Sequence, residues 1–373
     1  MTESLVGTQE FVGLDDLTHL CAGGEAPFLK SHLIALERFA TDKSAGMAGR
    51  DRMFEVYHDT KQQLSWLVNR PVSDIALLGS ASEGVNLVAQ TIDWGEGDNV
   101  VVGDVEFPSM LYPWTSLATQ GVELRLVKSR ERLLDLDDFR AVVDERTRVV
   151  AVSQVSFLTG QRISLPAMAN IAWERGARLL VDATHALGAV SVDANHCDYL
   201  VSSCYKWLLA SHGVGIFVWN RSRVPEILPT NVGWHTVTHS GGWSNPTVLA
   251  LRPDADRLEM GNPSFPSLYI LRNALERLAR VRAKDVERHV LELASDVRRR
   301  LVARNFEVTT PEAAASHAGN VCFKSASAGE ITKRLADEGI LVWGSEGRIR
   351  VSTHLYNSTA DVDRLFASLD YAA

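Results

Sequence analysis

The sequence lacks most of the features that mark secreted, membrane-bound or nucleic-acid-binding proteins. Its four cysteines are scattered and show no Cys-x-x-Cys spacing, which disfavours a disulfide framework and a zinc site and favours a reducing cytoplasm. We expect neither an N-terminal signal peptide nor an apolar run long enough to span a membrane. The net charge of −8 argues against nucleic acid or a membrane surface as a partner, because either would need a basic patch.

The remaining composition is that of an ordinary globular protein. Of its 373 residues, 46% are hydrophobic and 23% are charged, and this length accommodates a large domain and a smaller one. We expect an N-terminal segment at 1–25 and a large cofactor-binding domain at 26–256. A small C-terminal domain at 257–373, with a long interdomain helix, should follow.

Short apolar runs alternate with amphipathic stretches between about residues 70 and 220. Several runs are almost wholly apolar, as strands covered on both faces should be. The alternation predicts an α/β fold with a mostly parallel seven-stranded sheet and helices on both sides. The expected strands are 75–78, 100–102, 123–127, 149–153, 179–182, 199–202 and 214–218. The expected helices of this region are 83–92, 109–119 and 165–174.

The chain after the predicted sheet changes character. Residues 221–256 are rich in Gly, Pro, Trp, Ser and Thr and should be irregular. One long helix at 267–302 should then lead into the small α/β domain. In that domain the expected strands are 320–323 and 341–343, and the expected helices are 328–338 and a last helix from 359.

Polar side chains gather at the carboxyl ends of the predicted strands, where an open parallel sheet binds its ligands. Glu106-Phe107, Gln154, Asp182–His185 and Ser203–Lys206 all fall at that edge. A lysine and an aspartate on neighbouring strands suit pyridoxal 5'-phosphate (PLP). The lysine forms a Schiff base with the cofactor, and the aspartate keeps the pyridine nitrogen protonated so that the ring can act as an electron sink.

A turn of small residues at Ala81 and Ser82 leads from a strand into a helix. Backbone amides and hydroxyls at a helix N-terminus bind phosphate, and Ser82 would also serve as an N-cap. Taken singly, each of these features also fits a structural role: a helix cap, a core phenylalanine, a buried histidine or a surface lysine.

Together and in this order, the motifs resemble the class V aminotransferase family of fold-type I PLP-dependent enzymes. That family contains cysteine desulfurases, kynureninases and isopenicillin-N-epimerase-like proteins. The matching segments are Ala81-Ser82-Glu83-Gly84-Val85-Asn86-Leu87, Phe107, Ser153-Gln154-Val155, Asp182 with His185, and Ser203-Cys204-Tyr205-Lys206. The resemblance implies that Lys206, Asp182 and His185 are catalytic. The cofactor-binding residues that it implies are Ala81, Ser82, Phe107, Gln154, Asp182, His185, Ser203, Tyr205, Lys206 and Asn262.

The resemblance also implies a homodimer with shared active sites. In the family, a residue at the position of Asn262 reaches the cofactor phosphate of the partner subunit. Arg350 matches the arginine that grips the α-carboxylate of an amino-acid substrate, a contact that suits a guanidinium fork. Arg348 falls on the same face of the predicted strand, so the choice between Arg348 and Arg350 as the match to the family's arginine stays open.

The reaction stays open at this point. The site residues would serve transamination, epimerisation, elimination or side-chain cleavage, and we expect an aminotransferase ahead of a kynureninase-like or C–S lyase. A cysteine desulfurase is disfavoured, because the stretch before Arg350 contains no nucleophilic cysteine. A non-catalytic PLP-fold scaffold is disfavoured by the intact Asp182 and Lys206. His235 and His239 match no motif, and the loops that set side-chain specificity carry no readable pattern.

Overall fold

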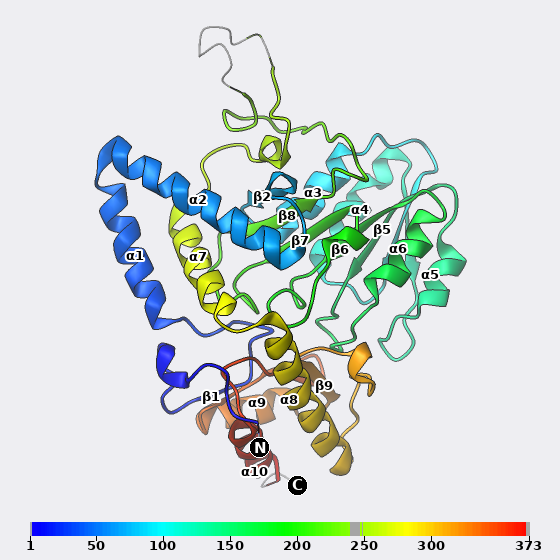
Figure 1. The fold of residues 1–373 in the computed structure, drawn as a ribbon. Helices are drawn as coiled ribbons and strands as arrows, with labels where there is room; N and C mark the ends of the chain where they lie inside the picture. The colour runs from blue at the N-terminus through cyan, green and yellow to red at the C-terminus, as the bar shows by residue number, and fades with distance from the viewer. Residues whose placement is uncertain (1, 239–246, 248, 371–373) are drawn as a thin grey trace.

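The computed structural model describes residues 2–238, 247 and 249–370, and a seven-stranded sheet forms its centre (Figure 1). The strands lie in the order β2-β8-β7-β6-β5-β3-β4. The pairs from β7 to β4 are all parallel, whereas β8 is antiparallel to both of its neighbours. Their bounds are β2 Ile75–Leu78, β3 Asn99–Gly103, β4 Glu123–Val127, β5 Thr147–Ser153, β6 Arg178–Asp182, β7 Tyr199–Ser203 and β8 Gly215–Trp219. The predicted fold class is confirmed, and each expected strand lies within two residues of its predicted bounds.

Helices cover both faces of this sheet because alternate side chains of each strand enter different apolar layers. Leu77, Val101 and Val150 pack on one face with residues of α2, α6 and α7. Their chain neighbours, such as Val100 and Val149, pack on the other face with α3 and α4. The helices around the sheet are α2 Gly46–Val68, α3 Ala81–Thr91, α4 Tyr112–Thr115, α5 Leu136–Val142, α6 Leu165–Trp173 and α7 Phe265–Ala279.

Two expected helices differ in the structure. The stretch 109–119 is not one helix but the turns η3 Pro108–Met110, α4 and η4 Ser116–Gln120, because prolines at the starts of η3 and α4 each begin a new turn. The expected helix 267–302 is two helices, α7 and α8 Ala283–Ala303, separated at Arg280–Arg282. α7 packs against α1 (Lys30–Lys43) and α2, whereas α8 packs against the second sheet, so the chain must turn between them (Figure 1).

A second, three-stranded antiparallel sheet has the order β11-β12-β9. Its strands are β9 Asn320–Lys324, β11 Trp343–Ser345 and β12 Arg348–Ser352, and α8, α9 Ala328–Asp337 and α10 Thr359–Asp370 share its apolar core. The expected strand 341–343 is divided between β10 (Ile340–Leu341) and β11. β10 pairs in parallel with β1 (Thr18–His19), which brings the N-terminal segment beside this sheet. The division into domains stays a prediction.

Among the residues that the structure describes, no helix combines the length and the apolar character needed to cross a bilayer.

Candidate active site

A pocket at the carboxyl ends of the central strands gathers most of the predicted site residues. It lies where β5, β6 and β7 end and where α3 begins, as the parallel sheet requires. Gln154, Asn262 and Arg350 lie outside its lining. The lining residues are Ala81, Ser82, Val85, Phe107, Ser109, Ser153, Val155, Phe157, Asp182, Thr184, His185, Ser203, Tyr205 and Lys206.

Lys206 follows β7, and its amine lies inside this pocket. Its Nζ is 3.2 Å from Nε2 of His185 and 5.8 Å from the centre of the Phe107 ring. The pKa of Lys206 is lowered to about 8, first by burial and then by the positive charge of Arg350, while Asp182 opposes the shift. A sizeable fraction of the amine is therefore neutral near neutral pH, the form that acts as a nucleophile or a base.

Asp182 ends β6 and is held by the turn that follows it. Its Oδ1 accepts the backbone N–H of Thr184 at 2.8 Å, and the Thr184 hydroxyl accepts the backbone N–H of Ser203 at 3.0 Å. The second bond ties this turn to the end of β7, which leads to Lys206. Burial raises the pKa of Asp182, because water no longer stabilises the charged form. Among the described residues no cation lies within ion-pair distance of its carboxylate.

A chain of hydrogen bonds sets the tautomer of His185. The Ser352 hydroxyl donates to Asn320 Oδ1 at 2.7 Å, and Asn320 Nδ2 lies 2.9 Å from His185 Nδ1. An amide nitrogen only donates, so Nδ1 accepts and the ring proton is on Nε2, which faces Lys206. Burial lowers the pKa of His185 well below its usual value and keeps the ring neutral. The neutral imidazole thus offers an N–H donor to the pocket.

Asn320 was not predicted from the sequence. It begins the apolar strand β9, and a polar residue at the start of such a strand was the only signal that could have marked it. Its role depends on the second sheet lying beside the pocket, and no local pattern encodes that placement.

Glu106 is a second residue whose role the sequence did not reveal. Its carboxylate accepts the backbone N–H of Ser153 at 2.7 Å and also the Ser153 hydroxyl. The pKa of Glu106 is raised to about 7, chiefly by burial and to a smaller extent by the charge of Asp182, against the opposing hydrogen bonds from Ser153. Glu106 thereby fixes Ser153 in the pocket wall.

Aromatic rings form the side of the pocket that faces solvent. Phe107 is 43% exposed, and its edge meets Phe157 at 5.2 Å between ring centres. Tyr205 stacks on His212 at 4.0 Å, and His212 lies 3.1 Å from Glu25. A large ring left open beside a polar pocket is suited to stacking on a flat ligand.

The N-terminus of α3 forms the opposite end of the pocket. Ser80 is its N-cap and accepts the backbone N–H of Glu83 at 3.1 Å, which corrects the expectation that Ser82 is the cap. Ser82 instead donates its hydroxyl to Ser109 at 2.8 Å. Because Ala81 and Ser82 line the pocket, the positive end of the helix dipole and free backbone amides are available to an anion there.

The structure does not bring the Gln154 side chain into the pocket. Ser153 and Val155 line it, and the alternation of side chains along a strand turns Gln154 to the other side. There its amide donates to the Ser191 carbonyl at 3.1 Å. The expected contact between Gln154 and the cofactor stays a prediction.

Arg350 lies on β12, next to the pocket. It is only 4% exposed, and its Nη1 donates to the backbone carbonyl of Phe157 at 3.0 Å, while its Nε has no hydrogen-bond partner. Burial lowers the pKa of Arg350. Its charge lowers the pKa of both Lys206 and His185, and its expected contact with a substrate carboxylate stays a prediction.

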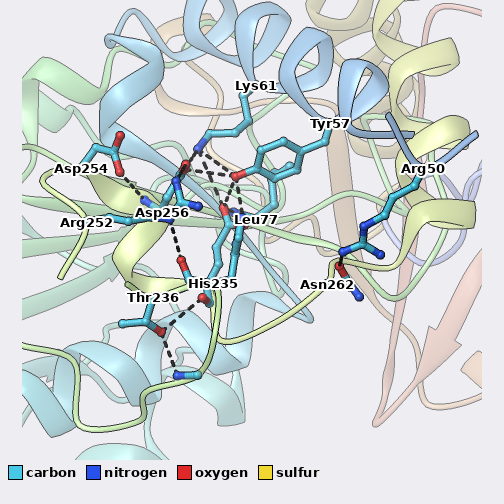
Figure 2. A network of polar contacts seen from close by, with 12 residues as sticks. Arg50, Tyr57, Lys61, Leu77, His235, Thr236, Arg252, Asp254, Asp256 and Asn262 are labelled. Carbon is cyan, nitrogen blue, oxygen red and sulfur yellow. Dashed lines mark hydrogen bonds and ion pairs between the residues drawn. The ribbon is translucent and has the colours of Figure 1, made fainter. Parts of the chain in front are cut away.

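Asn262 lies outside the pocket of its own chain. Its Oδ1 accepts a hydrogen bond from Arg50 Nη2 at 3.0 Å (Figure 2). The Arg50 guanidinium also lies 5.7 Å from the centre of the Trp234 ring. The expected reach of Asn262 into a partner subunit's site stays a prediction. His239 lies outside the described residues.

His235 belongs to a buried polar network on α2 and the loop before α7 (Figure 2). Tyr57 donates its hydroxyl to Glu259 at 3.0 Å, and His235 Nδ1 is 3.4 Å from the same carboxylate. Lys61, 3% exposed, pairs with Asp256 and lies 3.8 Å from Glu259. The network joins this loop to α2, so His235 has a structural role and does not line the pocket.

The residues of the pocket fit PLP on four counts. Lys206 supplies an amine of lowered pKa, and Asp182 supplies a carboxylate that lacks a counter-ion and suits a protonated ring nitrogen. Phe107 has an open ring face, and the start of α3 offers amides to a phosphate.

Comparison with known proteins gives the following matches. Residues 38–365 match the family model described as "Aminotransferase class-V". An uncharacterized aminotransferase of Schizosaccharomyces pombe is 26% identical over 318 residues, which are 82% of this chain and 79% of the relative. A cysteine desulfurase of Salmonella typhimurium is 27% identical over 343 residues, which are 84% of this chain and 82% of the relative.

Two solved structures have the same fold. The apo structure of a cysteine desulfurase from Thermococcus onnurineus superposes with a TM-score of 0.89 at 21% identity and covers 98% of this chain and 96% of its own. The cystine C–S lyase C-DES, in complex with its product cysteine persulfide, superposes with a TM-score of 0.88 at 21% identity and covers 96% and 98%.

Proposed function

Because the chain belongs to the aminotransferase class-V family and is a PLP-dependent enzyme, we propose that it is an aminotransferase acting on a small α-amino acid. Lys206 holds the cofactor and moves the α-proton. Asp182 holds the ring nitrogen, the Nε2–H of His185 donates to the cofactor, and Arg350 binds the substrate carboxylate.

The observation that carries this proposal is the state of the Lys206 amine. Its pKa of about 8 leaves neutral amine available in a pocket otherwise lined by aromatic, hydroxyl and carboxyl groups. When bound, PLP supplies an aldehyde that captures an amino group and a protonated ring that accepts the electron pair released at the α-carbon. The protein's part is to orient the substrate and to carry one proton, and Lys206 is the amine positioned to do so.

Arg350 supports an amino acid as the substrate. A buried guanidinium with an unpartnered Nε attracts a carboxylate, because burial without a counter-ion is costly. With the carboxylate held there, the α-carbon lies toward Lys206 and the side chain is left for other residues to recognise.

The thiols argue against persulfide transfer from a cysteine. All four cysteines lie in the described part of the chain, and burial raises the pKa of each of their thiols. A nucleophilic cysteine needs the opposite shift. Cys21, the one thiol that is not fully buried, lies close enough to Arg350 to feel its charge, yet burial outweighs that effect.

A lyase that cleaves a Cβ or C–S bond is the second candidate. It is favoured by the likeness to a Salmonella cysteine desulfurase over 84% of this chain and by the shared fold with the cystine C–S lyase C-DES. Epimerisation would use the same proton transfer at the α-carbon. We also propose that the protein is a homodimer in which the partner's loop at Asn262 completes the site.

A single-turnover experiment distinguishes these reactions. PLP-loaded protein is mixed with a panel of amino acids without an oxo-acid acceptor, and 2-oxo acid, ammonia and sulfide are measured per subunit. An aminotransferase yields one equivalent of the matching oxo acid and no ammonia. Continuous release of ammonia or sulfide would replace the proposal by the lyase. Lys206→Ala should abolish all product, whereas Lys333→Ala, an exposed lysine on α9, should not.

A further inference from the structure

Two buried arginines lie side by side on the substrate side of the site. Arg348 and Arg350 are two residues apart on β12, so their side chains share one face of the strand. They are 5% and 4% exposed. Trp343, directly opposite Arg350 in the register with β11, lies 4.7 Å from the Arg348 guanidinium and 5.1 Å from that of Arg350, measured to its ring centre.

The two guanidinium groups have hydrogen-bond capacity that the chain leaves unused. Arg350 donates to the Phe157 carbonyl at 3.0 Å, and Arg348 donates to the Leu158 carbonyl at 3.3 Å. The Nε of each has no hydrogen-bond partner. Among the described residues, the carboxylate within ion-pair distance of either is that of Glu346, 3.8 Å from Arg348 and itself 72% exposed.

Phe157 connects this pair of arginines with the cofactor pocket. Phe157 lines the pocket and its ring meets Phe107. The same residue contacts both arginines, since the Arg348 guanidinium lies 5.4 Å from its ring centre and its carbonyl accepts a hydrogen bond from Arg350. A substrate whose α-carbon lies at Lys206 therefore extends along Phe157 toward both charges.

One α-carboxylate would neutralise only one of these cations. The second would stay buried without a full counter-charge, which proteins rarely tolerate. Arginine is also the side chain suited to holding a carboxylate by two parallel bonds.

We infer that Arg348 is a specificity-determining residue that binds an acidic group in the substrate's side chain, so that the substrate class is the dicarboxylic α-amino acids. The inference rests on the proposed function, because it takes Arg350 as the site of the α-carboxylate. Aspartate and glutamate are two members of this class.

Binding of substrate analogues without an amino group tests this inference apart from turnover. Calorimetric titration of the PLP-loaded protein compares succinate with succinamate, in which one carboxylate is replaced by a neutral amide. Hydrogen bonds to a charged group predict that succinate binds about 10- to 150-fold more tightly. Arg348→Gln should remove most of this preference and leave the affinity for succinamate unchanged.

Two further variants serve as controls. Arg348→Lys keeps the charge but loses the fork and should retain part of the preference. Lys333→Gln, which removes an exposed charge on α9, should leave the preference for succinate unchanged. Equal affinity of the wild-type protein for the two ligands would overturn the inference, even if Arg348→Gln did not fold. The inference would also be overturned if the preference survived in folded Arg348→Gln, since a group other than Arg348 would then bind the second carboxylate.

The experiments distinguish a failure of the aminotransferase proposal from a failure of the acidic-group site at Arg348. If no amino acid gives an oxo acid but the preference for succinate is present and depends on Arg348, the aminotransferase proposal falls and the acidic-group site stands. If neutral amino acids give oxo acid as readily as aspartate and glutamate, the aminotransferase stands and the acidic-group site falls.

Discussion

The lowered pKa of Lys206 predicts how fast the protein takes up its cofactor at each pH. An ordinary lysine has a pKa of 10.5, and that of Lys206 is about 8. A difference of this size makes the neutral amine about 300-fold more abundant near pH 7, since each pKa unit is a factor of ten. Only the neutral amine attacks an aldehyde, so the rate of covalent attachment follows this fraction.

Rapid mixing of apo-protein with PLP measures this rate through the visible absorption of the attached cofactor. Between pH 5 and pH 7 the rate should rise about tenfold per unit, and above about pH 8 it should level off. A simple amine such as Nα-acetyl-lysine, mixed with PLP over the same range, corrects for the titration of PLP itself. Lys206→Ala should form no such band.

Variants of the two charged neighbours report the cause of the shift. Arg350→Gln should move the midpoint upward, because the charge of Arg350 lowers the pKa of Lys206. Asp182→Asn should move it downward, because the carboxylate favours the charged amine. A rate that still climbs tenfold per unit through pH 10 in the wild-type protein would refute the reasoning, since Lys206 would then titrate as an exposed lysine.

Three other predictions concern groups around the site. Lys61→Met should lower the free energy of unfolding by about 3–5 kcal/mol in urea denaturation, because it removes the buried cation that lies between the carboxylates of Asp256 and Glu259. Asn320→Leu should lower that free energy by about 1–3 kcal/mol and release His185 from its tautomer, which imidazole ¹⁵N shifts in histidine-labelled protein would report. Because the pKa of Glu106 is raised from 4.5 to about 7, the folded protein binds more protons between these values, so this group should cost about 3 kcal/mol of stability as pH rises from 4.5 to 7. Glu106→Gln should abolish that part of the pH dependence, and identical pH profiles for the two proteins would contradict it.

The sequence predicted the sheet well because its strands are covered on both faces. Buried runs such as 149–153 can be read without knowledge of their neighbours. The prediction of a single helix at 267–302 was wrong because the pattern of charged and apolar residues continues through the break at Arg280–Arg282. The helix breaks there because α7 and α8 pack against different parts of the protein. The orientation of Gln154 could have been read from strand alternation, since Ser153 faces the pocket. The role of Asn320 could not have been predicted from the sequence, because it depends on how the second sheet packs against the first.

The charges of the site give a physical reason for the proposed carboxylate site at Arg350 to lie beside the lysine. In the free protein the charge of Arg350 helps to lower the pKa of Lys206, which keeps the amine neutral for attachment of the cofactor. A substrate carboxylate bound at Arg350 would cancel that charge, and the pKa of Lys206 would then rise. The amine displaced by the substrate would thus become a stronger base when an α-proton is present to be removed. A neutral side chain at position 350 would abolish this coupling between substrate binding and basicity and remove the proposed contact with the carboxylate, so we expect Arg350→Gln chiefly to raise KM.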